Sequence, residues 1–497
     1  MKDEFEFIIE PEINDENAAW LEKQAETLEW MLDNPYGGTK PAAETGILEQ
    51  MGSLLWKCSG LDAETVLDAI EDALDDERSV RFIVTGGRFQ HFPWELLYHE
   101  NPEIGFLSRK TRCVVSRCVR YRKGRLKTPE KNALPFRILL FVSSPEGLDH
   151  KGRLDFEKEE ELLYTALDSH LRRGEVHIEV AEDGALETLV KLLEEKRFHA
   201  VILSMHGTYA KNLENEKEWG LLFEDKSTYE SAPVAGSVLA DALKNLPKGH
   251  RPDLMVLAAC RSAKHEQSAN SISNVARILH ESGFARVLGM RLSVLDAAAS
   301  VFNAELFRRL ALGEDLGRSV SIARAEVARG AWLGGSNGKD AGQGAVVQDP
   351  YAQWTLPVLL DRTKDGPMVD TNLPAELVER PRLPSVLIGD GTILLPERSS
   401  FIGRRREIRK HLRGFLDGTH PRVMFTGPGG VGKTALAGLF ARGLMEKLPD
   451  ARIMGFQAPF DLDKLFEPLR KEAFDGEEES NLKDAISKEP DEKERVR

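Results

Sequence analysis

AVILSMHG (residues 200–207) and DLMVLAACRS (residues 253–262) are the two stretches that decide the fold of this chain. Each begins with an apolar run typical of a buried parallel strand and then reaches a reactive side chain, His206 in the first and Cys260 in the second. In open α/β sheets, functional groups gather just beyond the carboxyl ends of the strands. We therefore expect His206 and Cys260 to lie side by side on one rim of a parallel sheet.

The sequence around these stretches alternates between strand and helix patterns. Strands separated by helices of about 10 to 15 residues predict βαβ units and a parallel sheet. The predicted fold class is α/β, with a doubly wound and mostly parallel sheet. The predicted strands are residues 137–144, 176–182 and 286–290, and the predicted helices are residues 156–173, 186–196 and the segment that ends at Gly283.

The chemistry of the two side chains points to a cysteine peptidase. A thiol is a weak nucleophile until it loses its proton, and a neighbouring imidazole can hold it as the thiolate and later protonate the leaving amine. His206 precedes Cys260 by 54 residues (260 minus 206), which fits the caspase type, with the histidine roughly 50 residues upstream of the cysteine. A single histidine or cysteine in an apolar strand is usually a packed core residue. The matching strand ends, the order and the spacing of His206 and Cys260 favour a catalytic dyad.

Several further motifs carry a family resemblance. They are FPWELL (92–97), SMHG, LAACRS, the helical stretch 285–327 and QWTLPVLL (353–360). Together they resemble a CHAT domain, a caspase-like peptidase related to separase. The resemblance covers roughly residues 1–360, with 1–130 as a degenerate N-terminal half and 131–360 as the catalytic half. AACRS departs from the caspase signature QACRG, so aspartate specificity is not expected.

The resemblance implies further site residues. The backbone N–H groups of Gly207 and Cys260 would stabilise the oxyanion, although Gly207 also suits a plain turn. An acidic residue at the position of Asp296 faces a basic P1 side chain in separase-like relatives, which implies cleavage after Arg or Lys. Asp296 equally suits the N-cap of the helix that follows it. Glu224 and Asp225 are the alternative acids.

A second domain follows a predicted linker at residues 361–400, where five prolines occur. VMFTGPGGVGKTALAGLFARGL (423–444) predicts a strand, a glycine-rich loop and a helix, in the order of a P-loop. In this pattern, backbone N–H groups and a lysine bind phosphate, and a threonine hydroxyl ligates Mg²⁺. The predicted ligands of ATP or GTP are Gly427, Gly429, Gly430, Gly432, Lys433 and Thr434, with Thr434 as the Mg²⁺ ligand.

Residues 401–497 resemble the start of a signal-transducing (STAND) NTPase of the NACHT or NB-ARC type, with FIGRRREIRKHLRGFL (401–416) as its first helix. After Thr434 no apolar strand ends in a pair of acids that could serve as Walker B. Either the chain is a fragment of a longer protein, which we favour, or the NTPase is vestigial. Hydrolysis by this chain alone is not expected. The resemblance implies homo-oligomerisation through this module.

Composition narrows the class of protein. The formal net charge of −14 argues against a general nucleic-acid binder. Residues 109–127 are an exception, with nine Lys or Arg and no acid, and we expect them to face solvent or an acidic partner. The acidic start lacks the pattern of a signal peptide, and no run is long and apolar enough to span a bilayer. We expect a soluble cytoplasmic protein with no membrane contact.

Two functions from different classes follow from these observations. The first is a cysteine endopeptidase that cleaves a protein substrate and is gated by the nucleotide-binding module, in bacterial antiviral defence or death-like signalling. The second is a scaffold without enzymatic activity, in which the caspase-like fold docks partners and only the NTPase switches. The intact His206, Gly207 and Cys260 favour the peptidase.

Overall fold

The computed structural model describes most of the chain, and this part falls into two units. The described residues are 5–33, 46–85, 88–119, 126–129, 132–146, 148, 156–260, 271–291, 296–330, 352–364, 366–376 and 404–448. Unit 1 comprises Met1–Leu377 and unit 2 comprises Val378–Arg497. Each unit is considered by itself.

An 11-stranded sheet forms the centre of unit 1. It contains two sets of parallel strands that run in opposite directions and meet where β13 pairs antiparallel with β12. The first set is β1 (Glu6–Ile9), β2 (Val80–Val84), β5 (Cys113–Arg117) and β13 (Pro357–Asp361), in this order across the sheet. The second set continues with β12 (Arg286–Met290), β11 (Leu254–Cys260), β8 (Ala200–Lys211), β6 (Phe136–Val142) and β7 (Val176–Val180). The predicted α/β class with a mainly parallel sheet is confirmed.

Helices cover both faces of the second set of strands. On one face, α4 (Phe156–Arg173), α8 (Asp296–Ala311) and α9 (Leu316–Ala328) contribute buried side chains to the same core as Ile202 and Val256. On the other face, α5 (Leu186–Glu195), α6 (Gly236–Ala242) and α7 (Ser271–Glu281) share a core with Leu203 and Leu257. Neighbouring residues of a strand thus enter different cores, as the alternation of side chains along a strand requires.

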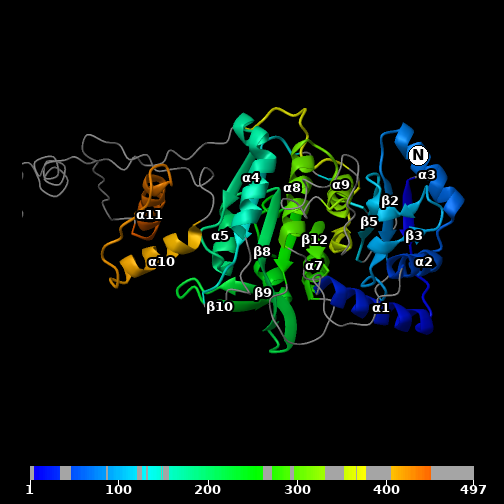
Figure 1. Ribbon diagram of the computed structural model, residues 1–497, viewed down its shortest axis with the longest axis horizontal. Helices are drawn as coiled ribbons and strands as arrows, with labels where there is room; N and C mark the ends of the chain where they lie inside the picture. The colour runs from blue at the N-terminus through cyan, green and yellow to red at the C-terminus, as the bar shows by residue number, and fades with distance from the viewer. Residues whose placement is uncertain are drawn as a thin grey trace, which may run out of the picture. The chain divides into compact units, whose positions relative to one another are not determined.

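The N-terminal part of unit 1 covers the first set of strands. Its helices are α1 (Asp15–Asp33), α2 (Ile47–Ser59) and α3 (Ala63–Asp75). A turn of 3-10 helix, η1 (Trp94–Leu96), lies within the FPWELL motif, and a small hairpin of β3 (Tyr98–His99) and β4 (Gly105–Phe106) follows it. Figure 1 shows β2 and β5 at one end of unit 1 and α4 and α5 at the other end, with α8 and α9 between them.

The strand that carries His206 is longer than the sequence predicts. β8 does not end near His206 but continues to Lys211, and its last residues pair antiparallel with β9 (Lys217–Glu224), which pairs with β10 (Ser231–Ala235). The predicted loop 207–253 is therefore mainly a three-stranded extension and a helix. The sequence changes from apolar to polar at His206, but the backbone remains extended because β9 supplies hydrogen-bond partners.

The first part of the predicted linker belongs to unit 1. Asn132 Nδ2 donates to the carbonyl of Met368 at 2.9 Å, and Asp370 N donates to the carbonyl of Asn132 at 2.8 Å. Met368 and Val369 are fully buried. The predicted boundary at residue 361 is therefore wrong, because residues up to 376 are held by backbone contacts that their irregular sequence pattern does not reveal. Residues 377–403 lie outside the described part.

The basic stretch 109–127, predicted to face solvent or an acidic partner, combines exposed and buried residues. Its centre forms β5, of which all five residues are buried. Arg117 makes a bidentate contact with Glu95 of η1, at 2.5 Å from Nη1 and 2.9 Å from Nη2. Residues 120–125 lie outside the described part. The charge of Arg117 is therefore neutralised by an acidic partner inside the protein.

Unit 2 is described over residues 404–448, and this part contains two helices, α10 (Arg405–Leu416) and α11 (Lys433–Lys447). Phe440 of α11 contacts the rings of Phe415 and Phe425, with centroids 5.8 and 6.0 Å apart. The strand predicted at residues 423–426 does not form, and Met424 is 84% exposed. A strand needs a neighbour to satisfy its backbone groups, and the described part of this unit offers none.

Glu95, Arg117 and Arg324 form a buried ion cluster. Removing the charge of Glu95 tests whether this cluster holds the FPWELL motif in place. Arg324 of α9 lies 3.6 Å from Glu95, donates to the carbonyl of Pro357 at 2.7 Å and is fully buried, as is Glu95. Burial alone would raise the pKa of Glu95. The nearby guanidinium groups of Arg117 and, to a smaller extent, Arg324 instead hold this pKa below its usual range. We expect Glu95→Gln to lower the free energy of unfolding by about 3–5 kcal/mol, since it leaves two buried guanidinium groups without a counter-charge.

Urea unfolding followed by fluorescence measures this change. Asp15→Asn is the matched control, because Asp15 pairs with Arg88 across 3.3 Å on the surface, where the two side chains are 91% and 74% exposed. We expect no measurable change for this control. Equal stability of Glu95→Gln and the unchanged protein would show that the cluster does not hold the motif.

Candidate functional site

Cys260 and His206 occupy paired positions on adjacent parallel strands. The register of β11 and β8 runs through seven consecutive Cα pairs, from Leu254 with Ala200 to Cys260 with His206. Cys260 is the last residue of β11. The predicted proximity of the two residues is thus present in the backbone. The side chain of Cys260 lies outside the described part, so the catalytic dyad itself stays a prediction.

The two positions belong to the same face of the sheet. Ala200 and Ile202 of β8, and Leu254, Val256 and Ala258 of β11, all enter the core that contains α4 and α8. Because residues two apart in a strand share a face, strand positions 206 and 260 both fall on the α4 and α8 side.

His206 lies at the point where the pairing of β8 with β11 ends and its pairing with β9 begins. It is the last residue of β8 to pair with β11 and the first to pair with β9, where its partner is Leu222. Its side chain is only 3% exposed. Because the backbone is bound on both sides at this position, the imidazole has a fixed point of attachment.

Gly207 follows within β8 and pairs with Leu221 of β9. It is a strand residue, so the interpretation of Gly207 as a plain turn is wrong. Its proposed role as an oxyanion donor stays a prediction.

Asp296 is the first residue of α8. The helix predicted after it is confirmed, whereas its side chain and residues 292–295 lie outside the described part. Both interpretations of Asp296, as the acid that meets a basic P1 side chain and as a residue that stabilises the start of the helix, therefore stay predictions.

Glu224 and Asp225, the alternative acids, already bind backbone and hydroxyl groups. Glu224 at the end of β9 is buried, and its two carboxylate oxygens accept from Ser144 N at 2.7 Å and Gly184 N at 2.9 Å. These contacts join the ends of β6 and β9. Asp225 is exposed and accepts hydrogen bonds from the hydroxyl and backbone N–H groups of Ser227 and Thr228, which lower its pKa to about 2.

A polar bridge beside the site was missed from the sequence. Glu159 of α4 accepts from Ser204 Oγ at 2.6 Å and from Asn303 Nδ2 at 3.0 Å, so it joins β8 to α8. Ser204 and Asn303 are 2% and 1% exposed. The three residues are separated by 45 and 144 positions in the sequence, and no local pattern connects them. Only the tertiary fold brings them together.

The other cysteines are unreactive in character. Cys58, Cys113 and Cys118 are buried and form no disulfide. Burial raises the pKa of Cys113 to about 12 and that of Cys118 to about 11, and it also raises the pKa of Cys58. Thiols of this kind carry little thiolate at neutral pH, so they are poor nucleophiles.

The described part of the chain contains neither a metal-binding cluster nor a membrane-spanning helix. No group of three or more His, Cys, Asp or Glu side chains there is arranged to hold a metal ion. None of the described helices combines the length and apolar character required to cross a bilayer.

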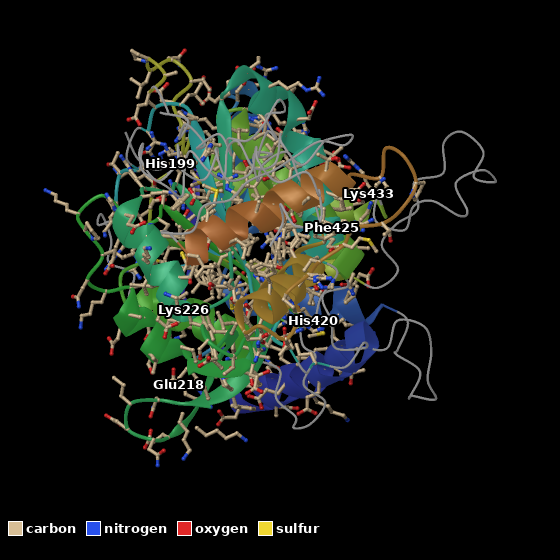
Figure 2. All side chains as sticks on the ribbon, turned by 90° about the vertical axis from the view of Figure 1, so that its left-hand side faces the viewer. His199, Glu218, Lys226, His420, Phe425 and Lys433 are labelled. Carbon is tan, nitrogen blue, oxygen red and sulfur yellow. The ribbon has the colours of Figure 1, made fainter. Side chains whose placement is uncertain are left out.

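In unit 2, the glycine-rich loop leads directly into α11. Lys433, the first residue of α11, donates through Nζ to the carbonyls of Gly427 and Pro428 at 3.0 and 2.8 Å (Figure 2). Gly430 and Gly432 have φ angles of 77° and 87°, a conformation that favours glycine. The loop is exposed, and nothing lies within 4 Å of a Cβ built at Gly429, Gly430 or Gly432. This open loop before a helix N-terminus, together with Lys433, fits a phosphate group.

Comparisons with solved structures gave remote similarities. The Saccharomyces cerevisiae separase–securin complex is 14% identical, with a TM-score of 0.34, and the alignment covers 71% of this chain and 23% of that chain. The complex of Porphyromonas gingivalis RgpB pro- and mature domains is 10% identical, with a TM-score of 0.34, and the alignment covers 73% of this chain and 78% of that chain. This chain therefore spans less than a quarter of the separase chain. A search of curated proteins returned no match.

The comparison with protein families gave a match to the CHAT domain over residues 55–354. The matched range contains FPWELL, both strands of the site and the helices α8 and α9. It spans more than half of the 497 residues. The chain therefore belongs to the CHAT domain family.

Proposed function

We propose that this chain is a cysteine endopeptidase of the caspase and separase class, with Cys260 as nucleophile and His206 as its acid–base partner. The observation that carries this proposal is the register pairing of Cys260 with His206 on one face of the sheet. Adjacent strand positions place the two Cα atoms about 5 Å apart, which is within the range that a cysteine and a histidine side chain can bridge. The family match and the order of the two residues support the same class.

The proposed reaction begins with transfer of the Cys260 proton to His206. The thiolate attacks the scissile carbonyl carbon, and the N–H groups of Gly207 and Cys260 stabilise the oxyanion. The imidazolium then protonates the leaving amine as the C–N bond breaks, which leaves a thioester on Cys260. Water, deprotonated by the imidazole, attacks the thioester, and the peptide leaves as a carboxylic acid while the dyad is restored.

The scaffold function is the alternative, and thiol reactivity separates it from the peptidase. We expect iodoacetamide to alkylate Cys260 faster than the three other cysteines at pH 7, since burial keeps those three thiols protonated. His206→Ala should lower the Cys260 rate by about tenfold or more, because the thiolate loses its partner. Mass spectrometry of the labelled peptides measures each rate. Equal labelling of all four cysteines would favour the scaffold.

Peptidase activity is tested with a positional-scanning fluorogenic peptide library. We propose cleavage after Arg or Lys, with Asp296 meeting the basic side chain, and we expect Cys260→Ala to lower activity by at least about a thousandfold. Asp296→Asn removes the charge but keeps a side chain that caps helices well. This substitution should lower kcat/KM for P1 Arg by about tenfold or more.

Asp225→Asn is the matched control for the selectivity assay, because it removes an exposed acid that neighbours another of the candidates. Unchanged P1 selectivity in Asp296→Asn, together with a loss in Asp225→Asn, would move the role to Asp225. A preference for P1 Asp or for aliphatic residues would overturn the assignment of a basic P1 side chain.

We further propose that unit 2 binds ATP or GTP with Mg²⁺ and that this binding gates the peptidase, with oligomerisation of a STAND-type module as its mechanism. The support is the shape of the loop and the place of Lys433, which would exchange the carbonyls of Gly427 and Pro428 for phosphate oxygens. When bound, the metal ion would neutralise phosphate charge, and Thr434 would hold it. A role in bacterial defence or death-like signalling belongs to the same proposal.

Titration with a fluorescent ATP analogue and Mg²⁺ tests the nucleotide site. We expect Lys433→Ala to raise Kd by about tenfold or more, since it removes a charge-assisted contact with phosphate. Lys226→Ala is the matched control, because Lys226 is an exposed lysine in the turn between β9 and β10 of unit 1 (Figure 2). Equal affinity of Lys433→Ala and the unchanged protein would rule out this loop as the site.

A further inference from the structure

The polar bridge of Ser204, Glu159 and Asn303 lies next to the proposed dyad. Ser204 and His206 are two residues apart on β8, which corresponds to about 7 Å along the strand. Ser204 donates to a carboxylate of α4, the helix that covers the face to which positions 206 and 260 belong. The carboxylate of Glu159 is therefore a negative charge on the His206 side of the sheet.

The bridge also reaches α8, at Asn303 in the middle of the helix. Asn303 lies seven residues after Asp296 (303 minus 296), so the two positions share one face of the helix and are about 10 Å apart along its axis. Asn303 is 1% exposed and donates to the second oxygen of Glu159. One carboxylate thus fixes the strand that carries His206 against the helix that begins at Asp296.

We propose that Glu159 is a positioning residue of the peptidase site. It holds β8 at a fixed place against α8 and supplies the negative charge that stabilises the imidazolium of His206. This inference rests on the proposed function. The charge acts through space and through Ser204, and Glu159 does not touch the substrate. Because its two oxygens accept hydrogen bonds from buried or nearly buried donors, the carboxylate has a fixed place relative to the strand.

The effect on the dyad has a defined direction. The Glu159 carboxylate is bound to Ser204, two residues before His206 on the same face of β8. A negative charge there favours the imidazolium, by on the order of one pKa unit at an effective dielectric constant between those of water and the protein interior. The same charge disfavours the thiolate. Removing it should therefore shift both limbs of the pH–reactivity profile of the Cys260–His206 pair to lower pH, because the pair titrates as a unit.

Other charged or titratable groups lie on neighbouring elements of unit 1. They are Glu160 of α4, Cys260 of β11, Glu224 of β9, Asp296 at the start of α8 and Arg291 directly after β12. Glu224 accepts hydrogen bonds from Ser144 N and Gly184 N. All of these groups are unchanged in the comparison below, so a difference between variants reports on Glu159.

The test measures the rate of Cys260 alkylation by iodoacetamide from pH 4 to 10 in the full chain. We expect Glu159→Gln to move both limbs of the profile to lower pH by about one unit. Glu159→Asp keeps the charge and should restore the position of the limbs. Glu161→Gln is the matched control, since Glu161 lies on the same helix, is 55% exposed and pairs with Lys158 at 2.9 Å. It should leave the limbs in place.

The outcomes separate the two proposals. If Cys260 is no more reactive than the other cysteines in the unchanged protein, the proposed function fails. If Cys260 is reactive but Glu159→Gln keeps both limbs at their original pH, the peptidase stands and the role of Glu159 is overturned. A lower rate without a shift of the limbs would overturn the electrostatic role and leave a structural one. Ser204→Ala keeps the charge, and we expect a smaller shift than for Glu159→Gln.

Discussion

The antiparallel pairing of β13 with β12 is the constraint on which unit 1 depends. Two sets of parallel strands run in opposite directions, and β13 joins them with five residue pairs to β12 and one to β5. Asp361 at the end of β13 lies between two buried arginines, Arg81 at 3.4 Å and Arg286 at 4.0 Å. β13, which comes last in the sequence among the described strands, therefore lies in the middle of the sheet and places a carboxylate between buried arginines of both sets.

This arrangement fixes the neighbours of the candidate site. β12 is held by β13 on one side and pairs with β11 on the other, and β11 in turn sets the register of β8. A slip of one residue would move every side chain of a strand to the other face. In β8 and β11 such a slip would exchange the two cores and remove positions 206 and 260 from the α4 and α8 side. The burial of Ile202 and Val256 on that side therefore also specifies the register of the site.

The sequence predicted the parts of the fold that local patterns determine. The apolar runs that lead to His206 and Cys260 and the periodic helix 156–173 correspond to β8, β11 and α4. The errors arose where a distant partner decides the structure. β8 is extended beyond His206 because β9 pairs with it, and Arg117 is buried because Glu95 neutralises it. The bridge of Glu159 depends on contacts across 45 and 144 positions, which no sequence window contains.

The change of strand partner from β11 to β9 at His206 determines how firmly the backbone that carries the imidazole is held. Beyond this residue β8 depends on β9, which is secured by contacts of two kinds. Tyr209 and Trp219 stack with centroids 3.7 Å apart, and Glu218 accepts from the backbone N and the hydroxyl of Ser237 at 2.7 and 2.8 Å, which joins the strand to the start of α6. His206 thus lies between two well-anchored segments, with β11 on one side and β9 on the other. In the proposed dyad, an imidazole attached at such a point would lose little conformational entropy on binding the thiolate, which favours a pre-organised pair over one that must assemble with substrate.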